Sequence, residues 1–395
     1  MSGGSDVLIV GGGLAGCTVA GQLAQAGRAG DVTIFEAEPE APYDRPPLTK
    51  SFLASEDLLS AWPVWAPRDV EWRYDAVDSI DLARRAIVTR SGEVLTASTI
   101  VIAVGARARI LPQRSDRIRT IRTAADARVL RDQVASGANR FLIEGAGPLG
   151  LEIASTLASA GVRVTVVDPA PAPMMRLLGG HLSDDVNAWA EESGVELLLG
   201  CRVTESHDTD SPTGVLARIG DGPLEAYDGM VSAVGIEANP LELHGTTGPV
   251  TSPILADEHG RILDPEGLPI DSVFAVGDIV GFRQPDGSIA RSEAWSSARV
   301  QGEAIARHLL GKPSLQAPVP YFWTRQFGRM IQVLGEVGPG SEIKVAREVP
   351  GATGKLYRVA RDGVPVGYIG VNAQRLVAQL QVQGGKLAHW RLGDV

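Results

Sequence analysis

The sequence predicts an α/β protein with two Rossmann-like dinucleotide-binding domains and a C-terminal α+β domain. The main observation is a pattern that occurs twice: an apolar run, a G-x-G-x-x-G loop, an Ala-rich helical stretch, and a second apolar run ending in an acid. The second observation is a set of short β-rich runs, separated by Gly turns, near the C-terminus. We expect the first dinucleotide-binding domain at residues 1–107 and 233–311, the second at 108–232, and the α+β domain at 312–395.

The first fingerprint starts with the apolar run Asp6–Val10, which the glycine loop follows directly. Gly11 permits a tight turn, Gly13 lets a pyrophosphate approach the backbone, and Gly16 lets the helix pack closely on the strand. The helix then presents unpaired N–H groups to the phosphates. Glu36 ends the next strand, 20 residues beyond Gly16, where an acid reaches a ribose hydroxyl pair. These features together predict a dinucleotide site.

The second fingerprint begins 134 residues later, with Gly145, Gly147 and Gly150 after the strand 140–143. Its second strand ends in Asp168, 18 residues beyond Gly150. A carboxylate at this position repels the 2′-phosphate of NADPH, so Asp168 favours NADH.

Two residues make the second fingerprint irregular. Glu144 places a carboxylate directly before the first glycine, near the expected position of a pyrophosphate. Pro148 is either an ordinary first-turn proline or a sign of an altered nicotinamide face. The irregularities keep open the interpretation that the nicotinamide site is degenerate.

The rest of the chain contains further strand and helix signals. Apolar runs that end in Gly or Gly-Asp predict strands at 99–105, 229–235 and 273–278, and apolar residues at helical spacing predict a helix at 293–310. Residues 311–320 are rich in Pro and small residues and suit a linker. In the last segment we expect strands at 331–334, 356–361 and 366–371 and a helix at 375–383.

Composition limits the class of protein. The 395 residues are 44% hydrophobic and carry a net charge of −10, which disfavours a nucleic-acid binder. The two cysteines, Cys17 and Cys201, form no C-x-x-C pair, which excludes a paired redox dithiol and a four-cysteine metal site, and we expect no metal. We find neither a basic signal-peptide region nor a long apolar run, and expect a cytoplasmic protein without a membrane partner.

Several short motifs point to one family. The most specific is Y-D-R-P-P-L-T-K at 43–50, and the others are A-V-G-A-R at 103–107, V-G-I at 234–236, A-V-G-D at 275–278, E-A-W at 293–295 and Y-F-W at 321–323. Over essentially its whole length the chain resembles the FAD-dependent pyridine nucleotide oxidoreductases, specifically the ferredoxin reductases of oxygenase systems.

The resemblance implies roles for the matching residues. Lys50, Glu152 and Trp295 are the expected catalytic residues, with Lys50 and Glu152 forming an ion pair at the flavin. The residues expected to contact FAD or NADH are Gly11, Gly13, Leu14, Ala15, Gly16, Glu36, Arg45, Lys50, Val77, Ala103, Gly105, Arg107, Gly277, Asp278, Glu293, Ala294, Trp295, Gly145, Gly147, Gly150, Asp168 and Arg176.

The chain also departs from the family pattern. Arg325 stands where the family's W-S-D-Q motif has an acid, Pro148 where hydrophobic gating residues are typical, and Ala172 where a basic residue is typical.

These observations favour an FAD-dependent enzyme that takes a hydride from NADH and passes electrons to a small iron–sulfur ferredoxin. The departures support an alternative, an FAD-dependent tailoring enzyme that acts directly on a small molecule. A non-catalytic FAD-binding interaction module is a third hypothesis, which rests on the shared fold alone.

Overall fold

The computed structural model describes residues 6–54, 62–111, 115–245, 253–284, 286–313, 319–349 and 354–384. The chain divides into two compact units, one comprising residues 1–44, 60–107 and 237–317 and the other comprising 45–59, 108–236 and 318–395. The described residues 45–54 therefore pack with the second unit, and the predicted second domain lies in one compact unit with the predicted third domain from Pro318 onward. The assignment of a separate cofactor to each predicted domain stays a prediction.

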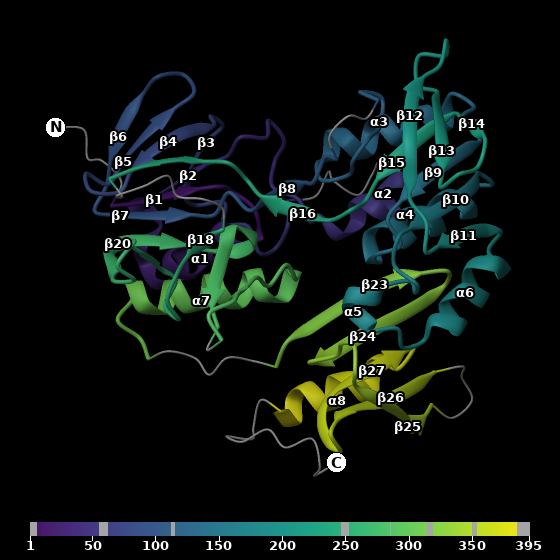
Figure 1. Cartoon of the computed structure of the whole chain (residues 1–395). Coiled ribbons are helices and arrows are strands. Elements are labelled where there is room, and N and C mark those ends of the chain that lie inside the picture. The colour runs from purple at the N-terminus through teal and green to yellow at the C-terminus, as the bar shows by residue number, and fades with distance from the viewer. Residues whose placement is uncertain are drawn as a thin grey trace. The chain divides into compact units, whose positions relative to one another are not determined.

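The first unit is built around a parallel sheet with one antiparallel edge strand. Its strand order is β19 (Arg261–Leu263), β20 (Pro269–Ala275), β7 (Thr99–Ile102), β1 (Val7–Val10), β2 (Val32–Phe35) and β3 (Glu71–Arg73). Helices α1 (Leu14–Leu23) and α7 (Trp295–Leu309) pack against each other on one face of this sheet (Figure 1).

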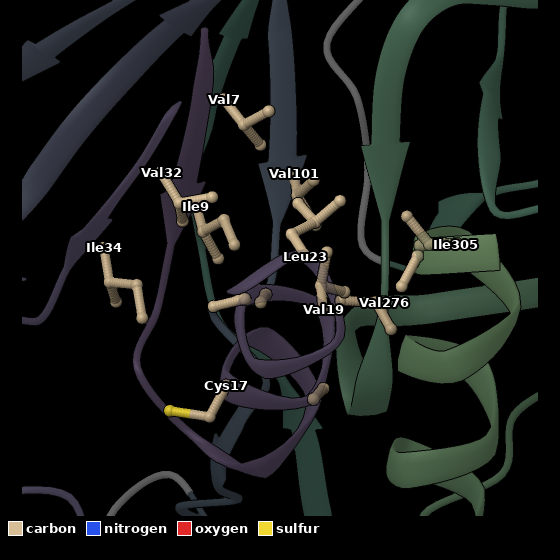
Figure 2. Close-up of a cluster of buried hydrophobic side chains, with 14 of the residues drawn as sticks. Val7, Ile9, Cys17, Val19, Leu23, Val32, Ile34, Val101, Val276 and Ile305 are labelled. Atoms are coloured by element: carbon tan, nitrogen blue, oxygen red, sulfur yellow. The ribbon is translucent and has the colours of Figure 1, made fainter. Parts of the chain in front are cut away.

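Alternating residues of the central strands build two apolar cores, as the two-residue period of a strand requires. Val7, Ile9, Val32 and Ile34 face α1, where they pack with buried helix residues such as Val19 (Figure 2). The intervening residues face the opposite side. There they pack against the sheet of β17 (Glu242–His244), β4 (Val77–Asp81), β5 (Ala86–Thr89) and β6 (Val94–Thr96). Both faces of the sheet are thus covered, as a parallel sheet demands.

The small strands β18 (Ile254–Leu255), β21 (Val280–Arg283) and β22 (Ile289–Ala290) complete the first unit. Short strands β8 (Ala106–Ala108) and β16 (Ile236–Ala238) pair where the chain passes between the units.

The second unit repeats the same plan on a smaller scale. A parallel sheet has the order β11 (Val195–Leu199), β10 (Arg163–Asp168), β9 (Arg140–Glu144) and β15 (Gly229–Ser232). Around it lie α2 (Ser51–Ala54), α3 (Ala124–Ala135), α4 (Pro148–Ser159), α5 (Met175–Leu178) and α6 (Ser183–Glu192). Between β11 and β15 the chain forms an antiparallel meander of β12 (Val203–Asp208), β13 (Val215–Ile219) and β14 (Leu224–Tyr227).

The C-terminal part of the second unit is an antiparallel sheet with one helix. Its order is β23 (Tyr321–Gln326), β24 (Arg329–Gly335), β27 (Val364–Val371), β26 (Lys355–Arg361) and β25 (Glu342–Glu348), with α8 (Gln374–Gly384) packed on β24 and β27. This is the predicted α+β fold, although the strands β23 and β25 were not predicted. Half of the predicted linker 311–320, residues 314–318, lies outside the described residues.

Several predicted boundaries need correction. The run 99–105 is a strand only to Ile102, because Gly105 has a positive φ of 67° and breaks the ladder. The run 229–235 likewise ends as a strand at Ser232. The helix after the first glycine loop, expected over residues 17–26, is α1 only to Leu23, and a π-helical turn, Ala24–Arg28, with Gly27 at a φ of 82°, follows it.

The surroundings of His308 lead us to expect a pH-dependent stability of the first unit. The His308 ring, in the last turn of α7, stacks on the His259 ring with 5.3 Å between ring centroids. Its centroid lies 5.6 Å from that of the Phe274 ring. Burial lowers the pKa of His308 from 6.5, and the nearby charges of His259 and Arg261 lower it further, opposed by Asp257. Below pH 6.5 the unfolded chain therefore binds more protons at this site than the folded chain, which destabilises the folded state.

We expect the unfolding temperature to fall as the pH drops below 6.5, and His308→Gln to flatten that fall. Thermal unfolding of both proteins across pH 5 to 8 measures the difference. If the unfolding temperatures of the two proteins fall in parallel with pH, His308 does not contribute to the pH dependence of stability.

Candidate functional site

The first glycine loop joins β1 to α1 and is shaped by close packing at two of its glycines. Gly11 has a φ of 112°, and a Cβ there would lie 2.4 Å from the Ala103 carbonyl oxygen. A Cβ on Gly16 would lie 2.2 Å from the Gly11 oxygen. Gly13 is different, since a Cβ there meets nothing within 4 Å. Gly11 and Gly16 are therefore required by the backbone packing of the loop, whereas Gly13 faces open space at the start of α1.

Glu36, at the end of β2, holds the loop from the side. Its carboxylate accepts hydrogen bonds from the backbone N–H groups of Gly12, at 2.8 Å, and Glu38, at 2.9 Å. Cys17 lies beneath the loop, where its thiol donates to the Gly12 oxygen. Burial, and then the Glu36 charge, raises the pKa of this thiol well above its ordinary value, so Cys17 is a packing residue rather than a nucleophile.

The second loop joins β9 to α4 and repeats this geometry. Gly145 also has a φ of 112°, with a prospective Cβ 2.5 Å from the Ala233 oxygen, and a Cβ on Gly150 would lie 1.9 Å from the Gly145 oxygen. Gly147 again faces open space. Asp168 accepts hydrogen bonds from the N–H groups of Ala146 and Ala170, both at 2.7 Å, as Glu36 does in the first loop.

The two irregular residues of the second loop have definite places. Pro148 is the first residue of α4, a position that suits proline because that N–H has no helical partner. Glu144, the last residue of β9, is 4% exposed and pairs in register with Ser232 of β15. Neither residue blocks the space at Gly147.

Both loops fit a dinucleotide. Each helix begins at a glycine, Gly13 or Gly147, with no side-chain cap and no acid in its first turn. Each therefore offers backbone N–H groups and the positive end of the helix dipole to an anion. The space in which a Cβ would lie is open at both glycines, which is where a pyrophosphate must approach the backbone.

Lys50 and Glu152, 102 positions apart in the sequence, form an ion pair in the second unit, with 2.6 Å between Nζ and Oε2. Glu152 lies on α4 and is 6% exposed. Lys50 follows the 3₁₀ helix Pro46–Thr49, and its Nζ also donates to the Pro46 oxygen at 3.0 Å. The pair is largely removed from water, so the loss of either charge would leave the other buried without a counter-ion.

Trp295, the first residue of α7, is 39% exposed. Its indole N–H donates to the Asp44 carboxylate at 3.2 Å, and the Trp65 indole N–H donates to the same oxygen at 2.9 Å. Asp44 thus fixes the exposed indole, and no sequence signal pointed to it.

Other predicted site residues already have protein partners. Glu293 pairs with Arg291 at 2.6 Å, and Arg107 pairs with Glu237 at 2.7 Å. Arg45 donates to the Arg122 oxygen at 2.6 Å. These contacts show that the three side chains are ordered by their own units, and their roles toward a cofactor stay predictions.

The remaining candidates lie around the ends of strands and helices. Gly277 has a φ of 83° and donates its N–H to the Gln301 side chain, a residue that was not predicted. Asp278, Val77, Ala294 and Leu14 are half-buried, Ala15 and Ala103 are buried, and Arg176 and Arg325 are exposed. Thr49 and Thr324, also not predicted, bond to Glu152.

Residues 5–302 of the chain match the pyridine nucleotide-disulphide oxidoreductase family. The chain belongs to this family. Two of its relatives are ferredoxin reductase components. One, from a Sphingobium species, is the ferredoxin reductase subunit of 5,5'-dehydrodivanillate O-demethylase. Its sequence is 31% identical to this chain, and the alignment covers 98% of this chain and 96% of the relative. The other, from a Cupriavidus species, is the ferredoxin reductase component of chlorobenzene dioxygenase. Its sequence is 32% identical to this chain, and the alignment covers 99% of this chain and 95% of the relative.

The fold agrees with these relatives. The chain superposes on the reductase of the covalent putidaredoxin reductase–putidaredoxin complex with a TM-score of 0.81 at 25% identity, over 96% of this chain and 92% of that chain. The predicted α/β fold class and the predicted family are therefore confirmed, as is the prediction of an FAD-dependent oxidoreductase that uses a pyridine nucleotide. The alternative tailoring enzyme is not favoured.

Two absences concern only the part of the chain that the structure describes. Its helices include none long and apolar enough to span a membrane. Its His, Cys, Asp and Glu side chains form no group of three or more that could hold a metal ion.

Proposed function

We propose that the chain is a cytoplasmic, NADH-dependent ferredoxin reductase, which passes electrons from NADH through FAD to a small iron–sulfur protein. The observation that carries the proposal is the presence of two glycine loops of the same geometry in one chain, each before an uncapped helix. The end-to-end similarity to ferredoxin reductase components of oxygenase systems supports the choice of acceptor.

In this proposal the first loop holds FAD and the second holds NADH. Gly13 and the start of α1 would bind the FAD pyrophosphate, with Glu36 at the adenosine ribose. Gly147 and the start of α4 would bind NADH in the same way, with Asp168 at its ribose. FAD, when bound, accepts a hydride and releases electrons singly, which suits a two-electron donor and a one-electron acceptor. Lys50, held by Glu152, would supply a positive charge at the flavin.

Asp168 should make the enzyme prefer NADH to NADPH. Its carboxylate is fixed by two backbone N–H groups, so it cannot swing away from a 2′-phosphate without losing them. We expect Asp168→Ala to reduce the preference for NADH by on the order of tenfold or more, the size of a charged hydrogen bond. Values of kcat/KM for both nucleotides test this, and a wild-type enzyme that prefers NADPH would contradict it.

Steady-state assays with different acceptors test the proposed function. We expect NADH consumption to depend on an added [2Fe–2S] ferredoxin and to saturate with its concentration. A rate that is independent of ferredoxin but rises with a small organic substrate would support the tailoring enzyme instead.

A further inference from the structure

The Glu152 carboxylate is the centre of a buried cluster that contains more than its ion pair. Oε1 accepts a hydrogen bond from the Thr324 hydroxyl at 2.5 Å, and Oε2 accepts one from the Thr49 hydroxyl at 2.6 Å. Oε2 also meets Lys50 Nζ at 2.6 Å. Three donors therefore converge on two oxygens, and both threonine side chains are buried. A carboxylate is the group that accepts on both oxygens and needs no donor of its own.

Three separate segments supply this cluster, which we call the hydroxyl clamp: Thr49 and Thr324 around Glu152. Thr49 ends the 3₁₀ helix Pro46–Thr49, Glu152 lies in α4, and Thr324 lies in β23. Thr156, one turn after Glu152, donates its hydroxyl to the Thr49 backbone oxygen at 2.8 Å and so ties α4 to the segment that carries Lys50. The clamp thus holds Glu152 from both sides and in a single orientation.

The clamp decides how Lys50 is presented. Two acceptors hold its ammonium group, Glu152 Oε2 and the Pro46 oxygen at 3.0 Å, and the Trp323 ring lies 5.2 Å from Nζ. An ammonium has three N–H donors, so one remains for a ligand. The Lys50 side chain is 19% exposed, which leaves that donor an approach.

We propose that Thr49 and Thr324 are positioning residues for flavin reduction by NADH. They fix the Glu152 carboxylate, which fixes the direction of the third Lys50 N–H. The geometry of the clamp stands on its own, whereas its effect on the flavin rests on the proposed function.

Matched variants separate the hydroxyls from their packing. Thr→Val keeps the shape of the side chain and removes the hydroxyl, whereas Thr→Ser keeps the hydroxyl and removes a methyl group. Thr324→Val and Thr49→Val, with Thr324→Ser and Thr49→Ser as controls, are prepared as FAD-loaded proteins of measured unfolding temperature.

The first readout needs no turnover. The sequence has five lysines, so the ammonium groups in ¹⁵N-lysine protein give a simple NMR spectrum, in which Lys50→Arg assigns Lys50. We expect slow water exchange of the Lys50 ammonium protons in wild type and in the Ser variants, and exchange on the order of tenfold faster in the Val variants. The second readout is the rate of flavin reduction at saturating NADH, expected to fall on the order of tenfold in the Val variants with NADH affinity unchanged.

The outcomes are distinct. Unchanged ammonium exchange in the Val variants, or Ser variants that behave as the Val variants do, would overturn the clamp. Faster exchange with an unchanged reduction rate would overturn its positioning role. If NADH does not reduce the wild-type flavin, the proposed function and the positioning role both fail, while the ammonium measurement still decides whether the clamp exists.

Discussion

Gly13→Val is expected to give a folded protein that binds no FAD. Gly13 has a φ of −71°, which valine adopts without strain, and its prospective Cβ meets no protein atom within 4 Å. We therefore expect the protein itself to tolerate the valine. The same side chain would fill the space where a pyrophosphate approaches the start of α1, so we expect the FAD affinity to fall by at least about a hundredfold.

Gly147→Val is the matched control, because Gly147 has the same geometry in the second loop, with a φ of −75°. This variant should keep FAD and lose NADH. Flavin absorbance of the purified proteins measures FAD binding, the unfolding temperature measures folding, and titration with NADH measures the affinity for NADH. A yellow Gly13→Val protein with wild-type FAD affinity would show that the first loop does not hold the cofactor.

The second large effect is on stability. Lys50→Met should destabilise the protein by about 3–5 kcal/mol, because it leaves the buried Glu152 carboxylate without its counter-ion. The double variant Lys50→Met, Glu152→Leu removes both charges and should be more stable than Lys50→Met. Chemical unfolding of the three proteins measures the free energies.

An exposed ion pair of equal length provides the control. Arg73 and Glu93 are also 2.6 Å apart, but their side chains are 32% and 44% exposed. Arg73→Met should therefore cost under about 1 kcal/mol, since water screens and solvates the remaining charge. Similar losses for Lys50→Met and Arg73→Met would mean that the Lys50–Glu152 pair is not energetically buried.

The parts of the fold that local patterns specify were predictable. The glycine spacing indicated both loops, because only glycine accepts the φ of 112° at Gly11 and Gly145 and the close backbone approach at Gly16. By contrast, the strand β25 was missed. It is an exposed edge strand with charged residues at most positions, and its apolar alternation of Ile343 and Val345 stops where the register with β26 shifts.

Contacts between distant segments were the least predictable. The Lys50–Glu152 pair was expected from family resemblance, not from spacing, and the threonines that complete the clamp were not expected at all. Thr324 occupies the serine position of a family motif, but a buried hydroxyl in a strand is not by itself a sign of a hydrogen bond across 172 residues. Asp44 accepts hydrogen bonds from two indole N–H groups that are distant in the sequence. It lies between two recognised motif residues, and its own role was not predicted.

Anaerobic mixing of the FAD-loaded protein with NADH tests the central claim most directly. The account predicts that NADH bleaches the flavin absorbance rapidly and that an oxidised [2Fe–2S] ferredoxin then restores it, with the iron–sulfur protein reduced in proportion. A flavin that dithionite bleaches but millimolar NADH does not would contradict the account.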